Sequence, residues 1–143
     1  MIEHVETPEK PLPRLDGPEA PFWQGLREGQ IRVQHCNACG TPRFPASRYC
    51  PKCHGDEFEW KEVGCEGEVE SFCVFHKAYF PGFVGEMPYA VIQVKLDDGV
   101  RFFSNIVGVS NDELSTGMRV SAVFERASPD VTLLKFQPVG DAL

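Results

Sequence analysis

Two C-x-x-C pairs lie close together in residues 36–53, which read CNACGTPRFPASRYCPKC. A C-x-x-C segment forms a tight turn that points both thiolates at one metal ion, and the ten residues between the pairs let two such turns converge. Gly40 follows the first pair and can adopt the backbone conformation that brings amides close to the sulfurs. The pattern therefore predicts a zinc ribbon with four thiolate ligands, from Cys36, Cys39, Cys50 and Cys53.

The predicted metal is structural zinc. Four thiolates complete a tetrahedral coordination sphere and leave no position for water or substrate, so the ion would support folding rather than catalysis. Iron is the alternative, because four cysteines also hold iron in rubredoxin-like sites. His35 and His54 flank the ligands, and with four cysteines present we assign both to the surroundings of the site.

The segments on either side of the cysteines are predicted to be a helix and strands. Residues 18–28 follow Asp16, a capping residue, carry apolar side chains at helical spacing and end before Gly29. Alternating polar and apolar residues, or runs rich in Val, Phe and Ile, predict seven strands. These strands cover residues 31–35, 58–63, 68–76, 89–96, 100–107, 118–125 and 131–137.

The last five strands are predicted to form one barrel. Asp97-Asp98-Gly99 is a strong hairpin signal, and Ser110 with Glu113 matches a capping box for one helical turn. This order favours an OB-fold, although another small barrel would give a similar pattern. We therefore expect a mainly β protein with an extended tail (1–17), an N-terminal helix and rubredoxin-like zinc ribbon (18–63), and a five-stranded OB-fold barrel (64–143).

Composition narrows the classes of partner and compartment. The 143 residues are 42% hydrophobic, enough for one real core. Fourteen basic against 21 acidic residues give a net charge of −7, which disfavours binding to nucleic-acid phosphates. No run reaches the ~18 apolar residues of a membrane helix, and the first residues lack the features of a signal peptide. We therefore expect a cytoplasmic protein that does not enter the membrane.

The two remaining cysteines give no case for catalysis. Cys65 and Cys73 have no partner at C-x-x-C spacing, and we expect both to be buried core thiols. A nucleophile would need a base, and His76, three residues after Cys73 along a predicted strand, would point to the opposite face. With no phosphate loop or Ser/His/Asp order elsewhere, the sequence predicts no catalytic residues.

An aromatic loop between the first two barrel strands is the most suggestive surface. Residues 76–88 contain large apolar side chains that are costly to expose, those of Tyr79, Phe80, Phe83 and Met87. This loop either folds back on its own barrel or contacts a partner or ligand. In the second case Lys77 could pair with an anionic group such as a phosphate.

The order of these parts resembles a known family. The resemblance rests on Phe22-Trp23-x-x-Leu26-x-x-Gly29, on Arg43-Phe44-Pro45 between the cysteine pairs, on Trp60 to Gly67, on Pro88-Tyr89-Ala90-Val91 and on Leu96 to Arg101. Over about 18–140 the chain is similar to rubredoxin-like zinc-ribbon plus OB-fold proteins that accompany acyl-CoA enzymes, notably thiolase-type and hydratase-type subunits. It departs from the family pattern at Ala46, at His54, where we expect glycine, and near Cys73.

The resemblance implies a non-catalytic accessory subunit in a hetero-oligomer. Its expected partner is a thiolase that cleaves a 3-oxoacyl-CoA with free CoA and carries the catalytic residues of this acyltransferase; a hydratase is the alternative partner. Structural zinc and CoA or acyl-CoA would be its ligands. The expected contacts with the partner, acyl chain or CoA phosphates are Phe22, Trp23, Arg43, Arg48, Lys52, Lys77, Tyr79, Phe80, Phe83 and Met87. For Arg43, Arg48 and Lys52 the simpler alternative is a solvated surface position.

A second class of function stays open at this point. OB-fold barrels with ribbons also bind single-stranded nucleic acid by stacking bases on aromatic side chains along a basic groove. The net charge of −7 counts against that function.

Overall fold

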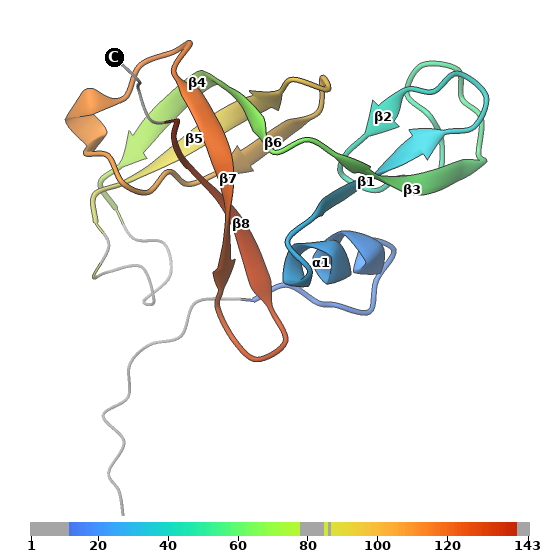
Figure 1. The fold of residues 1–143 in the computed structure, drawn as a ribbon, viewed down its shortest axis with the longest axis horizontal. Helices are drawn as coiled ribbons and strands as arrows, with labels where there is room; N and C mark the ends of the chain where they lie inside the picture. Colours follow the sequence, from blue (N-terminus) through green and yellow to red (C-terminus); the bar gives the residue numbers. More distant parts are fainter. Residues whose placement is uncertain (1–11, 78–84, 86, 140–143) are drawn as a thin grey trace, which may run out of the picture.

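The computed structural model describes residues 12–77, 85 and 87–139 (Figure 1). Most of the predicted tail and the predicted contacts Tyr79, Phe80 and Phe83 lie outside the described residues. The element order is α1 (Ala20–Arg27), β1 (Ile31–Cys36), β2 (Pro42–Arg43), β3 (Phe58–Val63), β4 (Glu66–Phe75), β5 (Tyr89–Leu96), β6 (Arg101–Ser104), the single turn η2 (Asn111–Glu113), β7 (Arg119–Arg126) and β8 (Thr132–Pro138). The predicted mainly β fold with one N-terminal helix, a ribbon and a five-stranded sheet is confirmed.

Helix α1 begins later than predicted and without the predicted cap. Glu19 occupies the N-cap position and makes no side-chain capping bond, so Asp16 does not cap this helix. The helix ends at Arg27, and Gly29 follows with a φ of 76°, which glycine adopts easily. Gln30 N–H then donates to the carbonyl of Gly25 at 2.8 Å. Its apolar side, with Phe22 and Leu26, is buried.

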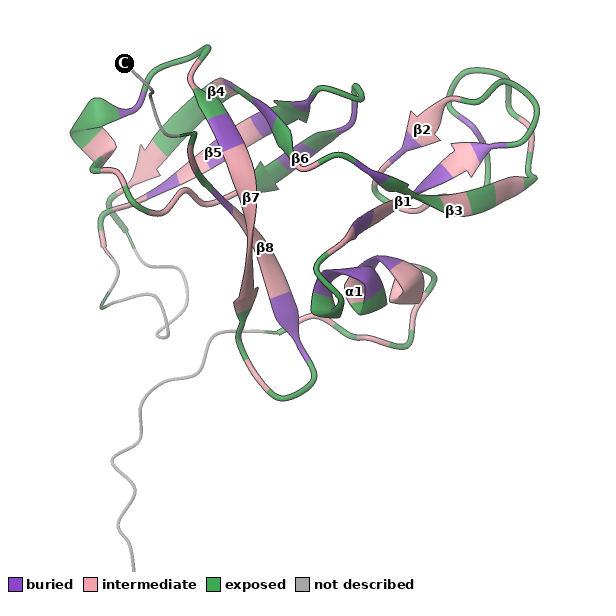
Figure 2. Cartoon of the chain, in the orientation of Figure 1, coloured by how far each residue is buried: buried purple, intermediate pink, exposed green. Residues whose placement is uncertain are grey.

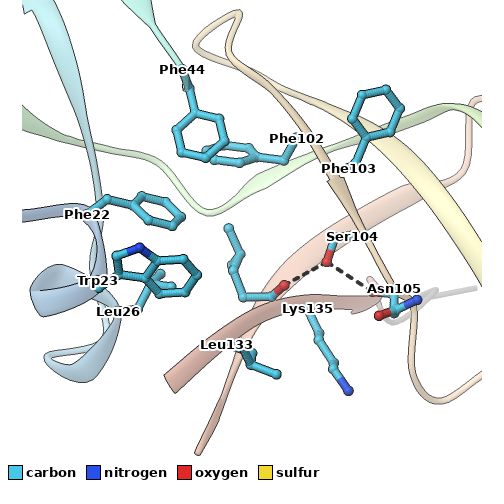
Figure 3. Close-up of a pocket in the computed structure, with 11 residues that line it drawn as sticks. Phe22, Trp23, Leu26, Phe44, Phe102, Phe103, Ser104, Asn105, Leu133 and Lys135 are labelled. Atoms are coloured by element: carbon cyan, nitrogen blue, oxygen red, sulfur yellow. Dashed lines mark hydrogen bonds between the residues drawn. The ribbon is translucent and has the colours of Figure 1, made fainter. Parts of the chain in front are cut away.

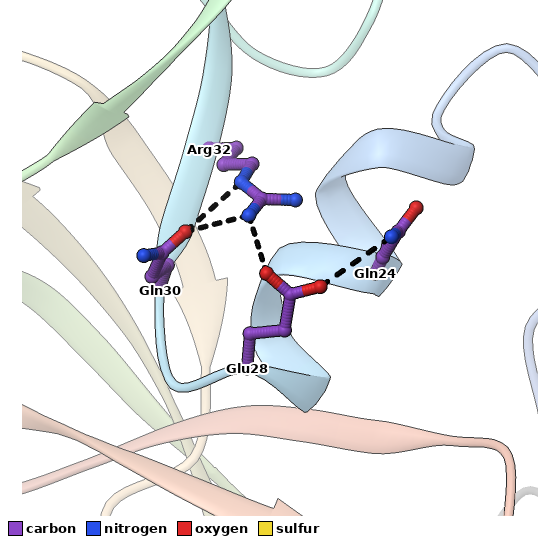
Figure 4. Close-up of polar contacts among 4 residues, drawn as sticks. All are labelled: Gln24, Glu28, Gln30 and Arg32. Atoms are coloured by element: carbon purple, nitrogen blue, oxygen red, sulfur yellow. Dashed lines mark hydrogen bonds and ion pairs between the residues drawn. The ribbon is translucent and has the colours of Figure 1, made fainter.

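Polar contacts tie the end of α1 to the start of β1 (Figure 4). Arg32 Nε donates to Gln30 Oε1 at 3.0 Å, and Arg32 Nη2 donates to Glu28 Oε1. The hydrogen bond from Arg32 lowers the pKa of Glu28, helped by a second bond from Gln24. These contacts link the C-terminal end of α1 to the first residues of β1.

The ribbon is an antiparallel sheet in the order β2-β1-β3. Strand β1 pairs with β3 over its whole length, from Ile31 opposite Val63 to Cys36 opposite Phe58. Strand β2 has only two residues, too short to produce an alternating pattern, and it was not predicted. It pairs Gln34 with Arg43 on the other side of β1.

The five remaining strands form one curled sheet in the order β6-β5-β4-β7-β8. Its two edges approach each other, because Ile106 makes a parallel bridge with Phe136 and Ser104 Oγ donates to the carbonyl of Leu134 at 2.6 Å. Buried residues alternate with more exposed ones along β5 (Figure 2), which places Ile92 and Val94 in the core. The predicted hairpin is present, with Gly99 at φ 96°.

The ribbon and the curled sheet are joined by only two residues, Gly64 and Cys65, which lie between β3 and β4. Gly64 N–H donates to Asp98 Oδ2 at 2.6 Å, which ties this link to the β5–β6 hairpin. Three rings complete the junction: Phe44 from the ribbon lies 4.4 Å from Phe102 of β6 and 4.8 Å from Phe22 of α1, measured between ring centroids. Helix, ribbon and sheet therefore share one apolar cluster.

No helix among the described residues has the length and apolar character needed to cross a membrane.

Candidate metal centre and junction cavity

The four predicted ligands come together at the far end of the ribbon. The Sγ atoms of Cys36, Cys39, Cys50 and Cys53 all lie within 4.8 Å of one another. Two of the separations are 3.5 Å (Cys36 to Cys53) and 3.6 Å (Cys39 to Cys50). Sulfurs at ~2.3 Å from a tetrahedral zinc ion would be about 3.8 Å apart. The donor set and its geometry therefore fit one zinc ion.

The two turns that carry the cysteines have the same backbone geometry. Gly40 N–H donates to the carbonyl of Cys36 and His54 N–H donates to that of Cys50, both at 2.9 Å. Gly40 has a φ of 76° and His54 a φ of 66°. The second turn therefore holds a histidine in the left-handed region that glycine occupies in the first.

Backbone N–H groups lower the pKa of one of the four thiols, that of Cys50. The N–H groups of Cys53 and Lys52 lie 3.5 and 3.3 Å from Cys50 Sγ and lower the pKa of the Cys50 thiol to about 6. At Cys53 the Gly55 N–H also lowers the pKa, but the thiol of Cys36 and the other cysteines outweigh it and raise the pKa to about 11. Four thiolates this close need a cation among them, which zinc would supply.

Zinc held by these residues would have a closed coordination sphere, so its chemistry would be structural. Within residues 12–77, 85 and 87–139, the four cysteines are also the only cluster of at least three His, Cys, Asp or Glu side chains placed to hold a metal.

The expectation that Cys73 is a buried core thiol is wrong, because Cys73 is exposed. The register of β4 against β5 shifts between Val69 and Ser71. A β-bulge of this kind reverses which residues face inward, so Val69 is buried while Cys73, four residues later, faces outward. Cys65 is half-buried, and burial, with the nearby carboxylates of Glu62 and Glu66, raises the pKa of its thiol.

The predicted contact residues occupy several different surroundings. Arg48 and Lys52 are exposed on the ribbon, Lys77 is exposed after β4, and Met87 is half-buried. Arg43 is only 4% exposed, which removes its side chain from the surface that a CoA phosphate could reach directly. Contacts of these residues with CoA stay predictions.

A cavity of about 250 Å³ lies where helix, ribbon and sheet meet (Figure 3). Phe22, Trp23 and Leu26 of α1 form one wall, Phe44 and Phe102 close it from the ribbon and β6, and Leu133 to Lys135 of β8 form the opposite side. The indole N–H of Trp23 is buried and has no hydrogen-bond partner within the described part of the chain. The cavity is therefore lined mostly by apolar side chains, with Ser104, Asn105 and Lys135 as its polar members.

Of the residues that line this cavity, only Phe22 and Trp23 of α1 were among the contacts predicted from the sequence. Phe102 and Phe103 are adjacent in β6, yet Phe102 is 4% and Phe103 76% exposed. A strand alternates its faces, so this pair signals one inward and one outward ring, but only the fold shows what each ring meets.

Two family models match the chain. The model described as "ChsH2, rubredoxin-like zinc ribbon domain" matches residues 23–59, and that described as "ChsH2, C-terminal OB-fold domain" matches residues 60–125. Fold and metal-site geometry thus define a zinc-ribbon plus OB-fold protein. Together with the relatives below, the two matches show that the chain belongs to the ChsH2-type family, also called DUF35, as the resemblance predicted.

A solved structure and two relatives illustrate the similarity. A chain in the structure titled "Ltp2-ChsH2(DUF35) aldolase" is 33% identical, with a TM-score of 0.79 over 89% of this chain and 98% of that one. A "Probable enoyl-CoA hydratase alpha subunit" from Thermomonospora curvata is 33% identical over 90% of this chain. The "Benzoylsuccinyl-CoA thiolase subunit BbsA" from Thauera aromatica is 29% identical over 73% of this chain and 62% of its own length.

This chain spans only 40% of the length of the Thermomonospora protein. The names of these relatives assign them to hydratase or thiolase enzymes as subunits. The family and the four clustered cysteines together support a structural zinc site in this chain.

Proposed function

We propose that this chain is a non-catalytic accessory subunit of an acyl-CoA-metabolising complex, whose partner is a thiolase-type enzyme that cleaves a 3-oxoacyl-CoA with free CoA. The observation that carries this proposal is its alignment with 98% of one chain in a structure whose title joins a ChsH2(DUF35) component to a second named component. A relative named as a thiolase subunit supports the thiolase assignment.

The chemistry of the described residues fits an accessory role. The four cysteines suit a metal ion with no open coordination position. Outside the cysteine cluster, Cys73 is exposed near the end of β4 and His76 directly follows the strand, so the two are three residues apart. In this proposal the groups that react with substrate belong to the partner.

The junction offers a surface that suits a protein partner. Phe103 is 76% exposed on β6, beside an apolar cavity, and a large ring in such a position is costly to leave in water. Aromatic side chains next to apolar pockets are common anchors of protein interfaces. We therefore assign the partner contact to β6 and to the rim of the cavity.

A hydratase partner is the second candidate, because the Thermomonospora relative is named as a hydratase subunit. Two assays on the same purified complex distinguish the candidates. A thiolase partner predicts CoA-dependent cleavage of a 3-oxoacyl-CoA, whereas a hydratase partner predicts addition of water to a 2-enoyl-CoA without any need for free CoA.

The test is affinity purification of the tagged chain from its native cells, followed by identification of stoichiometric partners and by both assays. A thiolase-like partner whose thiolysis activity requires this chain is the expected result. A chain that elutes alone, or whose binding to single-stranded nucleic acid falls steeply with salt, would overturn the proposal.

A pair of variants tests the assigned surface. Phe103→Ala should weaken the complex about tenfold or more, since an exposed anchor contributes to binding and little to folding. Tyr49→Ala, which removes a ring that is 54% exposed on the ribbon, is the matched control and should leave affinity unchanged. Equal affinities for both variants would remove β6 from the interface.

A further inference from the structure

Arg43 is a buried cation that forms no ion pair with any of the described residues. Its side chain is 4% exposed, and its Nε donates to Gln34 Oε1 at 2.9 Å. Both terminal nitrogens, Nη1 and Nη2, are buried and have no hydrogen-bond partner among the described residues, which excludes a carboxylate in direct contact there. The guanidinium carbon lies 4.8 Å from the centroid of the Phe58 ring.

A buried guanidinium in this position needs a negative charge nearby. A guanidinium does not lose its proton in proteins, so burial cannot be relieved by neutralisation. Contact with the face of Phe58 offsets part of the cost of desolvation, but a lone buried charge stays expensive. The source of the counter-charge must therefore be sought among the groups that share this face of the ribbon.

Strand register puts Arg43 in the row next to a predicted metal ligand. Gln34 and Cys36, two residues apart in β1, face the same side of the sheet and are both buried. Arg43 lies opposite Gln34, and Phe58 lies opposite Cys36, so the two rows are neighbours about 7 Å apart. Because the guanidinium reaches over Phe58, it extends from its own row toward the row of the metal ligand.

With zinc bound, the four cysteines would form a centre of net negative charge. Four thiolates around one Zn²⁺ have a formal net charge of about 2 − 4 = −2, and a bound ion with its ligands is often the largest local charge in a site. We propose that Arg43 is the counter-cation of the zinc–tetrathiolate centre and that its fixed charge strengthens zinc binding. The inference does not depend on the proposed partner or on CoA.

Gln34 holds the cation in that position. Its side-chain oxygen accepts from Arg43 Nε and also from Ser47 N–H, both at 2.9 Å. The same amide therefore fixes the guanidinium and the chain between the two cysteine pairs. Arg48, by contrast, belongs to that same segment but is exposed beside the ring of Tyr49.

Three variants of the full chain test the role of the charge. The measurement is the zinc dissociation constant from competition with a chelator of known affinity, with circular dichroism of the zinc-loaded protein as a check of folding. Arg43→Met should weaken zinc binding about tenfold or more, whereas Arg43→Lys, which keeps the charge, should stay within about threefold of the parent. Arg48→Met is the matched control and should leave the constant unchanged.

A fourth variant keeps the arginine in place. In Gln34→Glu the carboxylate can accept the same two hydrogen bonds but offers Arg43 a competing negative charge, so zinc binding should again weaken about tenfold. This variant also answers the question if Arg43→Met fails to fold. Unchanged zinc affinity in Gln34→Glu, or equal losses in Arg43→Met and Arg43→Lys, would show that Arg43 acts through packing or hydrogen bonding and would overturn the proposal.

Discussion

The ribbon and the barrel are stabilised in different ways. The barrel buries a continuous set of apolar side chains, among them Val69, Ile92, Val120 and Phe136, none of which is exposed. In the ribbon, the buried positions of the metal-binding face hold two thiols and two polar side chains, those of Cys36, Cys50, Gln34 and Arg43. A unit of about 40 residues rarely builds a sufficient apolar core and commonly relies on a metal instead. Sequence changes should therefore affect the two halves by different routes.

The largest effect is expected from removal of one metal ligand. Cys36→Ser should abolish stoichiometric zinc binding and unfold the ribbon, because structural zinc supplies about 10–16 kcal/mol in small zinc domains. Metal analysis and hydrogen exchange would show zinc loss, with lost protection in β1 and β3 and retained protection in β4 and β5.

Cys73→Ser is the control for that variant, since Cys73 is exposed and outside the cluster. Zinc stoichiometry should stay at one per chain. Full zinc binding by Cys36→Ser, or equal loss of protection in both halves, would contradict the division between a metal-held ribbon and a packed barrel.

The next largest effect should appear in the barrel alone. A Cβ added at Gly67 would lie 2.3 Å from the carbonyl oxygen of Lys95 and 2.7 Å from Cα of Leu96. Both are backbone atoms, so β4 and β5 would have to separate. Gly67→Ala should lower the free energy of unfolding of the barrel by about 2–3 kcal/mol.

Denaturant unfolding would measure this change, with chelator competition as the readout for the ribbon. Zinc affinity should be unchanged. Gly85→Ala is the matched control, because no atom of the described residues lies within 4 Å of the added Cβ there. A Gly67→Ala protein as stable as this control would mean that the two strands can separate at little cost.

The structures of the ribbon and of the barrel could be predicted from the sequence to different extents. The metal centre depends on local spacing, so the four cysteines alone placed it. Strand alternation predicted the barrel, but a pattern with a period of two cannot reveal the register shift after Val69 that turns Cys73 outward. Asp16 has the right residue type for a cap, yet the helix begins after Glu19.

The cavity and the burial of Arg43 depend on contacts that link distant parts of the chain. Phe22, Phe44 and Phe102 are separated by many residues and meet only after ribbon and barrel have packed. Arginine is a residue type that usually lies on the surface, yet Arg43 is buried. It lies in β2, whose two residues are too few to show the alternation that identifies a strand in a sequence. Neither feature has a local signal that a single sequence could show.

A smaller effect should distinguish the two metal-binding turns. The φ of 66° at His54 costs conformational free energy because of its Cβ, whereas Gly40 adopts a φ of 76° without strain. His54→Gly should stabilise the zinc-loaded ribbon by about 0.5–1 kcal/mol, after allowing for the greater freedom of glycine in the unfolded chain.

The reverse change provides the control for His54→Gly. Gly40→Ala introduces the same strain at a position where no atom of the described residues lies within 4 Å of the added Cβ, so it should destabilise the ribbon by about 1 kcal/mol. Thermal unfolding of the zinc-loaded proteins would measure both. Changes of the same sign in the two variants would show that the turns are not equivalent.

The smallest effect concerns acid sensitivity of the barrel. Arg119 donates two hydrogen bonds to the carboxylate of Asp97, at 2.9 and 2.8 Å, and these bonds lower the pKa of Asp97. The resulting stabilisation is present above the pKa of Asp97 in the unfolded chain and is lost as pH falls through the lowered value in the folded chain. The affected range therefore lies below about pH 4.

Asp97→Asn should remove this part of the pH dependence with little effect at neutral pH, because the pair is exposed. Hydrogen exchange in β4 and β5 between pH 3 and 7 would follow the barrel separately from acid release of zinc. A pH profile identical to that of the parent would show that Asp97 does not contribute.

The short link between β3 and β4 has a consequence for how such a chain can be divided. The two family models meet between residues 59 and 60, inside β3, where Trp60 pairs with Gln34. A gene fragment that begins at residue 60 would carry away part of the strand that completes the ribbon. Any natural or artificial exchange of one half for another would keep both sheets whole only if the splice fell in the link of Gly64 and Cys65, between β3 and β4.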